Sequence, residues 1–350
     1  MRPAAILLEP LLKPRVWGGA RLRGLGRTVG GDEPIGESWE LADLPADVPG
    51  GRSTIVRGPG RGGTLRDLMD ADRRAVLGDA RPAADGGFPL LIKLLDAGRD
   101  LSVQVHPTPS YAAKHPGARL KTESWFVMDA DPGARLLLGF RPEFQPSPNP
   151  GDLRAAARDG RIVDMLQAVA ATPGSCHTLP SGLCHALGGG ILALEVQTPS
   201  DTTFRLYDWD RDGRELHLDA AIACLGGADA PASAITESAG RPAVSDHDSA
   251  VSGRPAPDHA APLARTSAYR MDLMGVGSGS TSTATITPAA DHRPSVVTVV
   301  AGAGRLEDDD GEIELAPGTT VLVPAAVNSI AIRGSDDLRF VRTVPEAMED

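Results

Sequence analysis

The chain has 350 residues, of which 41% are hydrophobic and 23% are charged, and its formal net charge is −11. A globular chain of this size can hold two domains, and its acidic balance without a basic run argues against nucleic acid or an anionic membrane as a partner. The three cysteines show no C-x-x-C spacing, which argues against a disulfide framework, and no apolar run has the length of a signal peptide or a membrane span, so we expect a cytoplasmic protein.

The first third of the chain is predicted to contain one helix and then buried strands. The 40 glycines and 30 prolines favour turns and short strands over long helices. Thr64 is suited to cap a helix that ends at Gly78, with a break near Asp70. The apolar run from Phe88 to Ala97 predicts a buried strand that is interrupted only by Lys93, which is either a lysine at a sheet edge or an inward-facing charge with a function.

The next stretch, Leu101-Ser-Val-Gln-Val-His-Pro, alternates strictly between apolar and polar residues. In a strand this alternation places Ser102, Gln104 and His106 on one face, where a Gln and a His two residues apart can reach the same ion. Alternation alone favours an edge strand with a solvated face. Further strands are expected at 122–129 and 136–140, followed by a mostly helical segment at 152–171 that Gly160 would divide in two.

The rest of the chain is predicted to be rich in β-structure, apart from a short helix at 215–225. Strands are expected at 175–179, 191–197, 202–207, 269–274, 282–287, 295–301, 312–316, 319–323, 328–333 and 338–343. Short strands at this spacing are typical of a sandwich or a closed barrel. The acidic run that begins at Asp308 lacks the spacing of a calcium loop and is expected to be a hairpin turn. The stretch 226–263, rich in Ala, Pro and Ser, is interpreted as a linker between a β domain at 1–225 and a smaller one at 264–350.

Several of these strands carry polar side chains on one face. They are Ser102, Gln104 and His106; Lys121 and Glu123; Glu195 and Gln197; and Thr203, Arg205 and Tyr207, with His185 in a turn-rich run before the Glu195 strand. Because buried polar groups need partners, so many polar faces in one β protein indicate an interior cavity rather than a solvated surface. His, His, Glu and Gln fit a divalent cation with nitrogen and oxygen ligands, zinc first, with manganese, iron or cobalt as alternatives. The histidines expected at surfaces or helix ends are His115, His177 and His217.

Six strings, correct in order and spacing, resemble the type I mannose-6-phosphate isomerases, most closely the short bacterial form. The strings are Lys13-Pro-Arg-Val-Trp-Gly-Gly, Ile35-Gly-Glu-Ser-Trp, Phe88-Pro-Leu-Leu-Ile-Lys-Leu-Leu-Asp-Ala, Leu101-Ser-Val-Gln-Val-His-Pro, Lys121-Thr-Glu-Ser-Trp and Pro180-Ser-Gly-Leu-Cys-His-Ala-Leu-Gly, and the segment from Leu194 to Asp208 continues them. The resemblance implies a mainly β fold: a cupin (jelly-roll) barrel followed by a smaller cupin-like C-terminal β domain.

The resemblance also implies a site with one zinc ion per chain. Carried over position by position, the zinc ligands are Gln104, His106, Glu123 and His185, and the active-site residues are Arg205, Lys121 and Glu195. One departure from the family is Leu187, since eukaryotic relatives have a tyrosine at its place and no phenol is available here.

The implied reaction interconverts mannose 6-phosphate and fructose 6-phosphate through a cis-enediol, so the expected partner is a small phosphosugar, bound by a monomer or a weak homo-oligomer. The base that moves the proton would be Glu195, Lys121 or a zinc-bound water, and Arg205 could stabilise the enediolate. Donors for the phosphate are Lys93, Ser102, Lys121 and Arg205, while Trp17 either walls the pocket or packs in the core. Two alternatives are another metal-dependent cupin enzyme, such as an oxygenase, and a sugar-binding cupin without catalysis.

Overall fold

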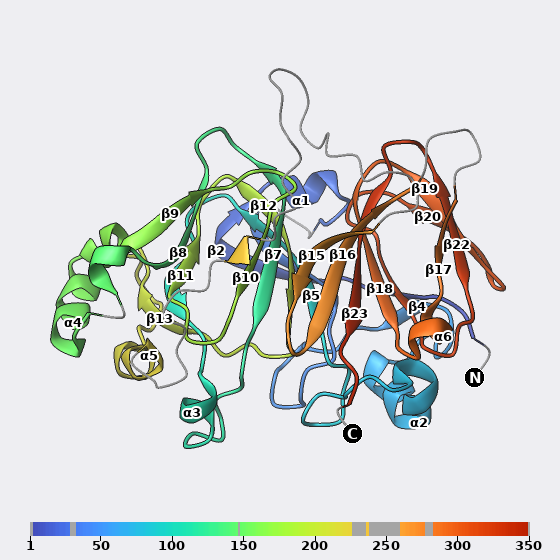
Figure 1. Ribbon diagram of the computed structural model, residues 1–350, viewed down its shortest axis with the longest axis horizontal. Helices are drawn as coiled ribbons and strands as arrows, with labels where there is room; N and C mark the ends of the chain where they lie inside the picture. The colour runs from blue at the N-terminus through green and yellow to red at the C-terminus, as the bar shows by residue number, and fades with distance from the viewer. Residues whose placement is uncertain are drawn as a thin grey trace.

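Four antiparallel β-sheets, arranged as two sandwiches, make up most of the protein, as the ribbon of the computed structural model shows (Figure 1). The structure describes residues 3–28, 33–145, 148–225, 236–237, 260–276 and 283–348. The strands of each sheet come from parts of the chain that are far apart in sequence, so pairing between distant strands assembles the fold.

The first sandwich pairs a seven-stranded sheet with a five-stranded one. In spatial order, the larger sheet contains β14 (Thr236–Glu237), β10 (Cys176–Leu179), β7 (Glu123–Ala130), β12 (Ile191–Gln197), β5 (Leu91–Ala97), β2 (Leu11–Gly19) and β3 (Ile35–Leu41). The smaller sheet contains β13 (Phe204–Tyr207), β6 (Val103–Val105), β11 (His185–Leu187), β8 (Arg135–Phe140) and β9 (Leu166–Ala170). Leu95, Trp125 and Leu138 belong to the apolar cluster that joins the two sheets.

The second sandwich is built mainly from the C-terminal part of the chain. Its seven-stranded sheet contains β15 (Ala261–Arg265), β16 (Tyr269–Gly275), β23 (Arg339–Pro345), β18 (Ser295–Ala301), β21 (Thr320–Val323), β1 (Ile6–Leu8) and β4 (Ile55–Arg57). Its four-stranded sheet contains β17 (Thr283–Ile286), β22 (Ile330–Gly334), β19 (Gly304–Asp308) and β20 (Gly311–Leu315). The N-terminal strands β1 and β4 therefore complete a sheet whose other members follow residue 260.

The two seven-stranded sheets pack back to back and form the largest core of the protein. Leu94 and Leu194 from the first sandwich share this core with Met271 and Val341 from the second. Since β5 is buried on both faces, its sequence is a continuous apolar run and shows no alternation, as predicted from the run that ends at Ala97.

Six α-helices and two 3₁₀ helices accompany the sheets in the described ranges. They are α1 (Arg21–Gly24), α2 (Leu65–Leu77), α3 (Pro109–Ala112), η1 (Pro142–Phe144), α4 (Pro150–Arg158), η2 (Arg161–Met165), α5 (Leu218–Leu225) and α6 (Pro288–Asp291). Helices α4 and α5 cover the outer face of the five-stranded sheet, on the left of Figure 1, where Leu153 and Ile222 join Val103 and Val105 in one apolar cluster.

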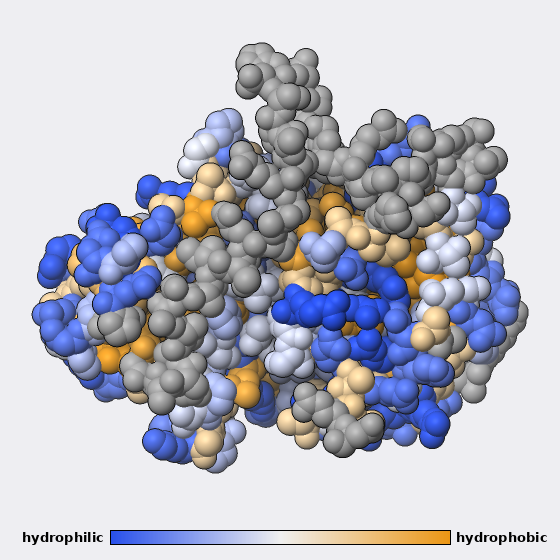
Figure 2. All heavy atoms as spheres, in the orientation of Figure 1, coloured by the Kyte–Doolittle hydropathy of each residue, from blue (hydrophilic) through white to orange (hydrophobic). Residues whose placement is uncertain are grey.

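Apolar side chains are mostly enclosed between these layers. On the face shown in Figure 2, hydrophobic residues form scattered areas among hydrophilic ones. Among the helices described, none combines the length and apolar character that crossing a membrane requires.

The predicted helix between Thr64 and Gly78 is confirmed as α2. The Thr64 side chain accepts from the backbone N–H of Asp67, whose carboxylate accepts from the backbone N–H of Thr64 in return, which completes a capping box. Asp72 has non-helical backbone angles, so the predicted break is present, and Gly78 ends the helix with a φ of 57°. The predicted hairpin turn at Asp308 is confirmed too, because Asp308 pairs with Gly311 between β19 and β20.

The prediction for 152–171 is wrong in its last third. Helix α4 ends at Arg158, η2 ends at Met165, and residues 166–170 form strand β9. Leu166 and Val169 continue the helical spacing, yet pairing with β8, in which Val169 lies opposite Leu136, decides the conformation. Other strands that were not predicted are β1, β4, β11, β14, β15 and β19.

Most of the stretch 226–263 lies outside the described residues. Its described parts are β14 and the start of β15 at Ala261. The division of the chain into domains at 1–225 and 264–350 stays a prediction.

Candidate active site

A cavity of about 360 Å³ lies in the first sandwich. Its walls come from both sheets of that sandwich and from the segments on either side of β13. The lining residues with polar or aromatic side chains are Arg15, Trp17, Glu37, Trp39, Lys93, Ser102, Gln104, Lys121, Trp125, Glu195, Asp201, Thr203, Arg205 and Arg214.

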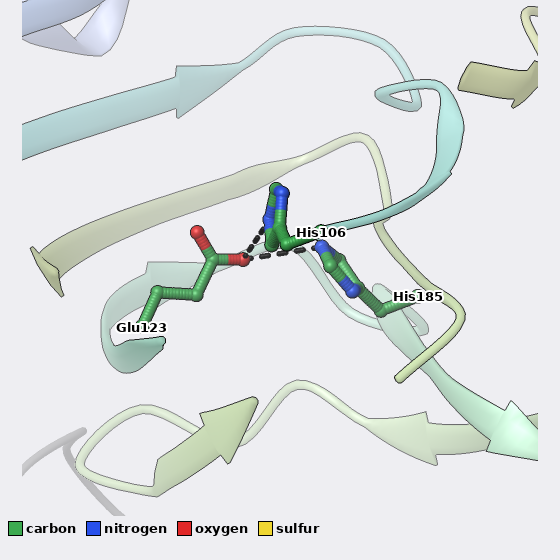
Figure 3. A group of neighbouring side chains, drawn as sticks. All are labelled: His106, Glu123 and His185. Carbon is green, nitrogen blue, oxygen red and sulfur yellow. Dashed lines mark hydrogen bonds and ion pairs between the residues drawn. The ribbon is translucent and has the colours of Figure 1, made fainter. Parts of the chain in front are cut away.

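Beside this cavity, His106, Glu123 and His185 point toward one another (Figure 3). All three are fully buried, and one potential ligand atom from each lies within 4.8 Å of the others. His106 directly follows β6, Glu123 begins β7 and His185 begins β11. Pairing of β6 with β11 sets His185 opposite Gln104, and this register brings the two histidines to one point.

The hydrogen bonds of the two imidazoles fix which nitrogen faces Glu123. His106 Nδ1 lies 3.2 Å from the Thr202 carbonyl oxygen, and His185 Nδ1 lies 2.8 Å from that of Leu183. A carbonyl only accepts, so each Nδ1 donates, and in a neutral imidazole with this tautomer Nε2 carries the lone pair. Burial, together with the charge of Lys121, lowers the pKa of His106 to about 3, which favours the neutral ring.

Three lone-pair atoms therefore meet at this point. Glu123 Oε1 lies 3.3 Å from His106 Nε2 and 3.1 Å from His185 Nε2 (Figure 3). Burial would raise the pKa of Glu123, but the charge of Lys121 holds it well below its usual range, so the carboxylate is charged. Two imidazole nitrogens and a carboxylate oxygen that face one another stabilise a shared cation, and histidines oriented through their other nitrogen are typical of metal sites.

Gln104 extends this group on the cavity side. Its Nε2 lies 3.2 Å from His185 Nε2, and its Oε1 accepts a hydrogen bond from Ser102 Oγ at 3.1 Å. A half-turn of the Gln104 amide would present its oxygen to a cation held by the other three residues. The structure thus brings the four predicted ligands together.

Two lysines and two glutamates alternate from Glu123, beside the cavity, along the cavity wall to Lys93. Lys121 Nζ lies 2.7 Å from Glu123 Oε2 and 3.9 Å from Glu195 Oε1. Lys93 Nζ lies 2.8 Å from Glu195 Oε2, so this lysine is an inward-facing charge and not an edge lysine. Trp125 Nε1 donates to Glu195 Oε1 at 3.0 Å.

The two central groups of this wall, Lys121 and Glu195, both have a raised pKa, for different reasons. Burial would lower the pKa of Lys121, but Glu123 and Glu195 raise it, so this lysine stays protonated. Burial raises the pKa of Glu195 and outweighs the lowering by Lys121 and Lys93. A buried carboxyl with a raised pKa is suited to take up and release a proton.

Arginines form the other side of the cavity. Arg214 Nη1 lies 2.9 and 3.0 Å from the two oxygens of Asp208, and Arg15 Nε lies 2.7 Å from Glu37 Oε1. Arg205 differs, because no hydrogen bond or ion pair joins its guanidinium to a residue in the described part of the chain, and its Nε is buried. Burial and the neighbouring Arg214 lower the pKa of Arg205.

The cavity lining has more cationic than acidic side chains, within an acidic protein. Its lining contains five cationic side chains (Arg15, Lys93, Lys121, Arg205 and Arg214) and three carboxylates (Glu37, Glu195 and Asp201). The chain as a whole has a formal charge of −11. A local excess of cations next to an unpaired guanidinium suits an anionic ligand such as a phosphate ester.

Of the other residues that the sequence singled out, some line the cavity and others lie away from it. Trp17 and Ser102 line the cavity. Tyr207 does not share the face of Arg205, because a bulge follows Arg205 and Tyr207 packs against the helical layer. His177 is buried, with 3% exposure, and not at a surface as expected.

Arg15, Glu37, Trp39 and Arg214 are among the lining residues that the sequence did not single out. The first three lie inside the two N-terminal strings, which were noted only as family motifs. Lys93 and Arg15 lower the pKa of Glu37 to about 2, although burial opposes them, and Trp39 Nε1 donates to Glu37 Oε2 at 2.6 Å.

Comparisons with known proteins agree with one another. A model of the type I phosphomannose isomerase catalytic domain matches residues 6–132, and one of the mannose-6-phosphate isomerase cupin domain matches residues 281–345. Mannose-6-phosphate isomerase ManA of Bacillus subtilis is 37% identical over 231 residues, which are 63% of this chain and 68% of that protein. YvyI of the same organism, a protein assigned to the mannose-6-phosphate isomerases, is 30% identical over 344 residues, which are 96% of this chain and 98% of its own.

A solved structure extends the similarity to the fold. The crystal structure of the mannose 6-phosphate isomerase from Bacillus subtilis matches with a TM-score of 0.73 and 27% identity. The match covers 97% of this chain and 99% of that one. Both sandwiches are therefore shared with that structure.

Proposed function

This chain belongs to the type I phosphomannose isomerase family, and from that premise we propose that it interconverts D-mannose 6-phosphate and D-fructose 6-phosphate in the cavity of the first sandwich. The observation that carries the proposal is the position of Glu195, a buried carboxylate between two lysines and beside the His106, Glu123 and His185 group. A carboxylate of this kind can move a proton between two adjacent carbons of a bound sugar.

The cation of this family site is proposed to be zinc, one per chain. His106, Glu123 and His185 would hold it, with the oxygen of Gln104 as fourth ligand, since nitrogen and oxygen ligands in this number suit zinc. When bound, the ion supplies a Lewis acid that stabilises negative charge on a substrate oxygen. This group is the one set of three such side chains found in the described ranges.

The substrate phosphate is proposed to bind on the arginine side of the cavity. The Arg205 guanidinium has no protein partner there and can bind a phosphate through two N–H groups at once. Arg214, which Asp208 holds in place, adds a second positive charge. Ser102 lines the same cavity as a further donor, whereas Lys93 is already engaged with Glu195.

Glu195 is proposed as the base that transfers the proton. The C2–H bond of ring-opened mannose 6-phosphate breaks, its proton goes to the Glu195 carboxylate, and its electron pair forms the C1–C2 double bond while the C1 carbonyl pair moves onto O1. The O2 proton then moves to O1, the Glu195 carboxyl returns its proton to C1, and a carbonyl remains at C2. Lys121 stays protonated throughout and stabilises the charge on the enediolate oxygens.

A coupled assay for fructose 6-phosphate formed from mannose 6-phosphate tests this proposal, on protein whose bound metal has been quantified. The proposal predicts turnover in both directions. If metal-loaded protein shows no turnover with either sugar phosphate, the substrate assignment is wrong.

A further inference from the structure

Strand β13 is the outermost strand of the five-stranded sheet, and β6 is its partner on one side only. Arg205 lies opposite Gln104 in this pairing. On its other side an edge strand exposes backbone N–H and C=O groups that no neighbouring strand takes up. The position of Arg205 therefore depends on what its own backbone N–H and C=O groups bind on that side.

A single residue, His217, takes up both of them. The backbone N–H of His217 donates to the Arg205 carbonyl at 2.8 Å, and His217 Nδ1 accepts from the backbone N–H of Arg205 at 3.3 Å. As an acceptor, Nδ1 carries the lone pair, so the neutral ring carries its proton on Nε2. Burial and the charge of Arg205 lower the pKa of His217, which favours this neutral form.

His217 is itself held by the helical layer. It directly precedes α5, and its carbonyl accepts from the backbone N–H of Ala221 at 2.9 Å. Ile222 and Leu225 of α5 pack in the cluster that contains Val103 of β6. A rigid connection thus runs from the sheet through α5 and His217 back to the edge strand.

We propose that His217 is a positioning residue for Arg205, and that its ring acceptor fixes the backbone from which the guanidinium reaches the cavity. This inference rests on the proposed role of Arg205 in binding substrate. The guanidinium has no side-chain partner in the described part of the chain, so no such contact holds it in place. Its position is therefore set by the Arg205 backbone, which the two hydrogen bonds to His217 hold. The bulge that follows Arg205 removes regular pairing with β6 on the next residues, so the two bonds to His217 matter more.

Two substitutions separate positioning from simple packing. His217→Leu removes the acceptor and keeps an apolar side chain, whereas His217→Asn keeps an acceptor oxygen at the same distance from the backbone as Nδ1. We expect His217→Leu to lower kcat/KM about 10-fold or more, because small misplacements of a binding group are costly, with bound metal unchanged. His217→Asn should recover most of this loss, and His115→Asn, at an exposed histidine near α3, should match wild type.

A double variant tests whether His217 acts through Arg205. If His217 acts through Arg205, His217→Leu costs nothing further once Arg205→Ala is present. Additive losses, or equal activity in the Leu and Asn variants, would overturn the inference. If the wild-type protein shows no turnover, the proposed function is wrong. If Arg205→Ala is impaired while His217→Leu is fully active, the proposed function stands and only the inference about His217 is wrong.

Discussion

Lys93 Nζ lies 2.8 Å from Glu195 Oε2, and the two residues face each other directly across the paired strands β5 and β12. On the other side of β12, Trp125 of β7 donates to Glu195 Oε1. Both oxygens of the carboxylate are therefore oriented by neighbouring strands. A base placed on the central strand of three needs little rearrangement when a substrate binds.

Glu195→Gln keeps the shape of the side chain and removes its ability to take a proton. We expect kcat to fall by about 10²- to 10⁴-fold, the usual contribution of a general acid–base group. Bound metal should be unchanged, since Glu195 is not among the three clustered ligand residues. Steady-state kinetics with metal analysis of the same samples checks this, and near-normal kcat would show that another group moves the proton.

Lys93→Met should move the acid limb of the pH–activity profile to higher pH. Lys93 lowers the pKa of Glu195, so its removal raises that pKa, and a smaller fraction of the carboxyl is ionised at a given acidic pH. Profiles of kcat/KM against pH for the variant and wild type measure the shift. Lys114→Met, at an exposed position, is the matched control. If the acid limb stays in place in both variants, its pKa does not belong to Glu195.

Arg205→Ala should lower kcat/KM about 100-fold or more, because the substrate phosphate loses its bidentate partner and the sugar is no longer held in the reactive position. The Arg205 guanidinium is the one cation of the cavity lining that has no hydrogen-bond or ion-pair partner in the described ranges, and its removal leaves the His106, Glu123 and His185 group intact. Kinetics with mannose 6-phosphate and quantified metal give the comparison. Near-normal turnover in this variant would make Arg205 structural.

Tyr269 links the two sandwiches, and its removal should affect stability first. Its hydroxyl donates to the Val196 carbonyl at 3.0 Å and lies 3.0 Å from Ser124 Oγ, in the core between the seven-stranded sheets. Tyr269→Phe leaves buried polar groups without this partner and should reduce the free energy of unfolding by about 1–3 kcal/mol. Denaturant unfolding measures this, with Tyr207→Phe as control, since the Tyr207 hydroxyl bonds Asp210 in an exposed position. Equal stabilities of the two variants would contradict this role.

Much of the fold could be predicted because strands are read from local alternation. The alternation after Leu101 placed Gln104 and His106 on one face, and both lie beside the cavity. Strand β9 was missed because Leu166 and Val169 keep a helical spacing, and only pairing with a distant strand decides otherwise.

Site residues that lie on a polar strand face could be predicted from the sequence. Site residues that reach the cavity only through the pairing of distant strands could not. Arg15 and Glu37 lie on β2 and β3, which extend the sheet beyond β5, and Glu37 reaches the cavity through its register with Leu95. No local pattern encodes that register. His217 was expected at a surface or a helix end and does precede α5, but its two bonds to Arg205 depend on the tertiary fold.

Zinc titration of chelated protein, with activity and bound metal measured on the same samples, tests most directly whether the His106, Glu123 and His185 group is the metal centre of an isomerase. The account predicts that activity disappears with the metal, returns in proportion to bound zinc and levels off at one ion per chain, while His106→Ala binds none. Full activity in metal-free protein, or full zinc binding by His106→Ala, would contradict it.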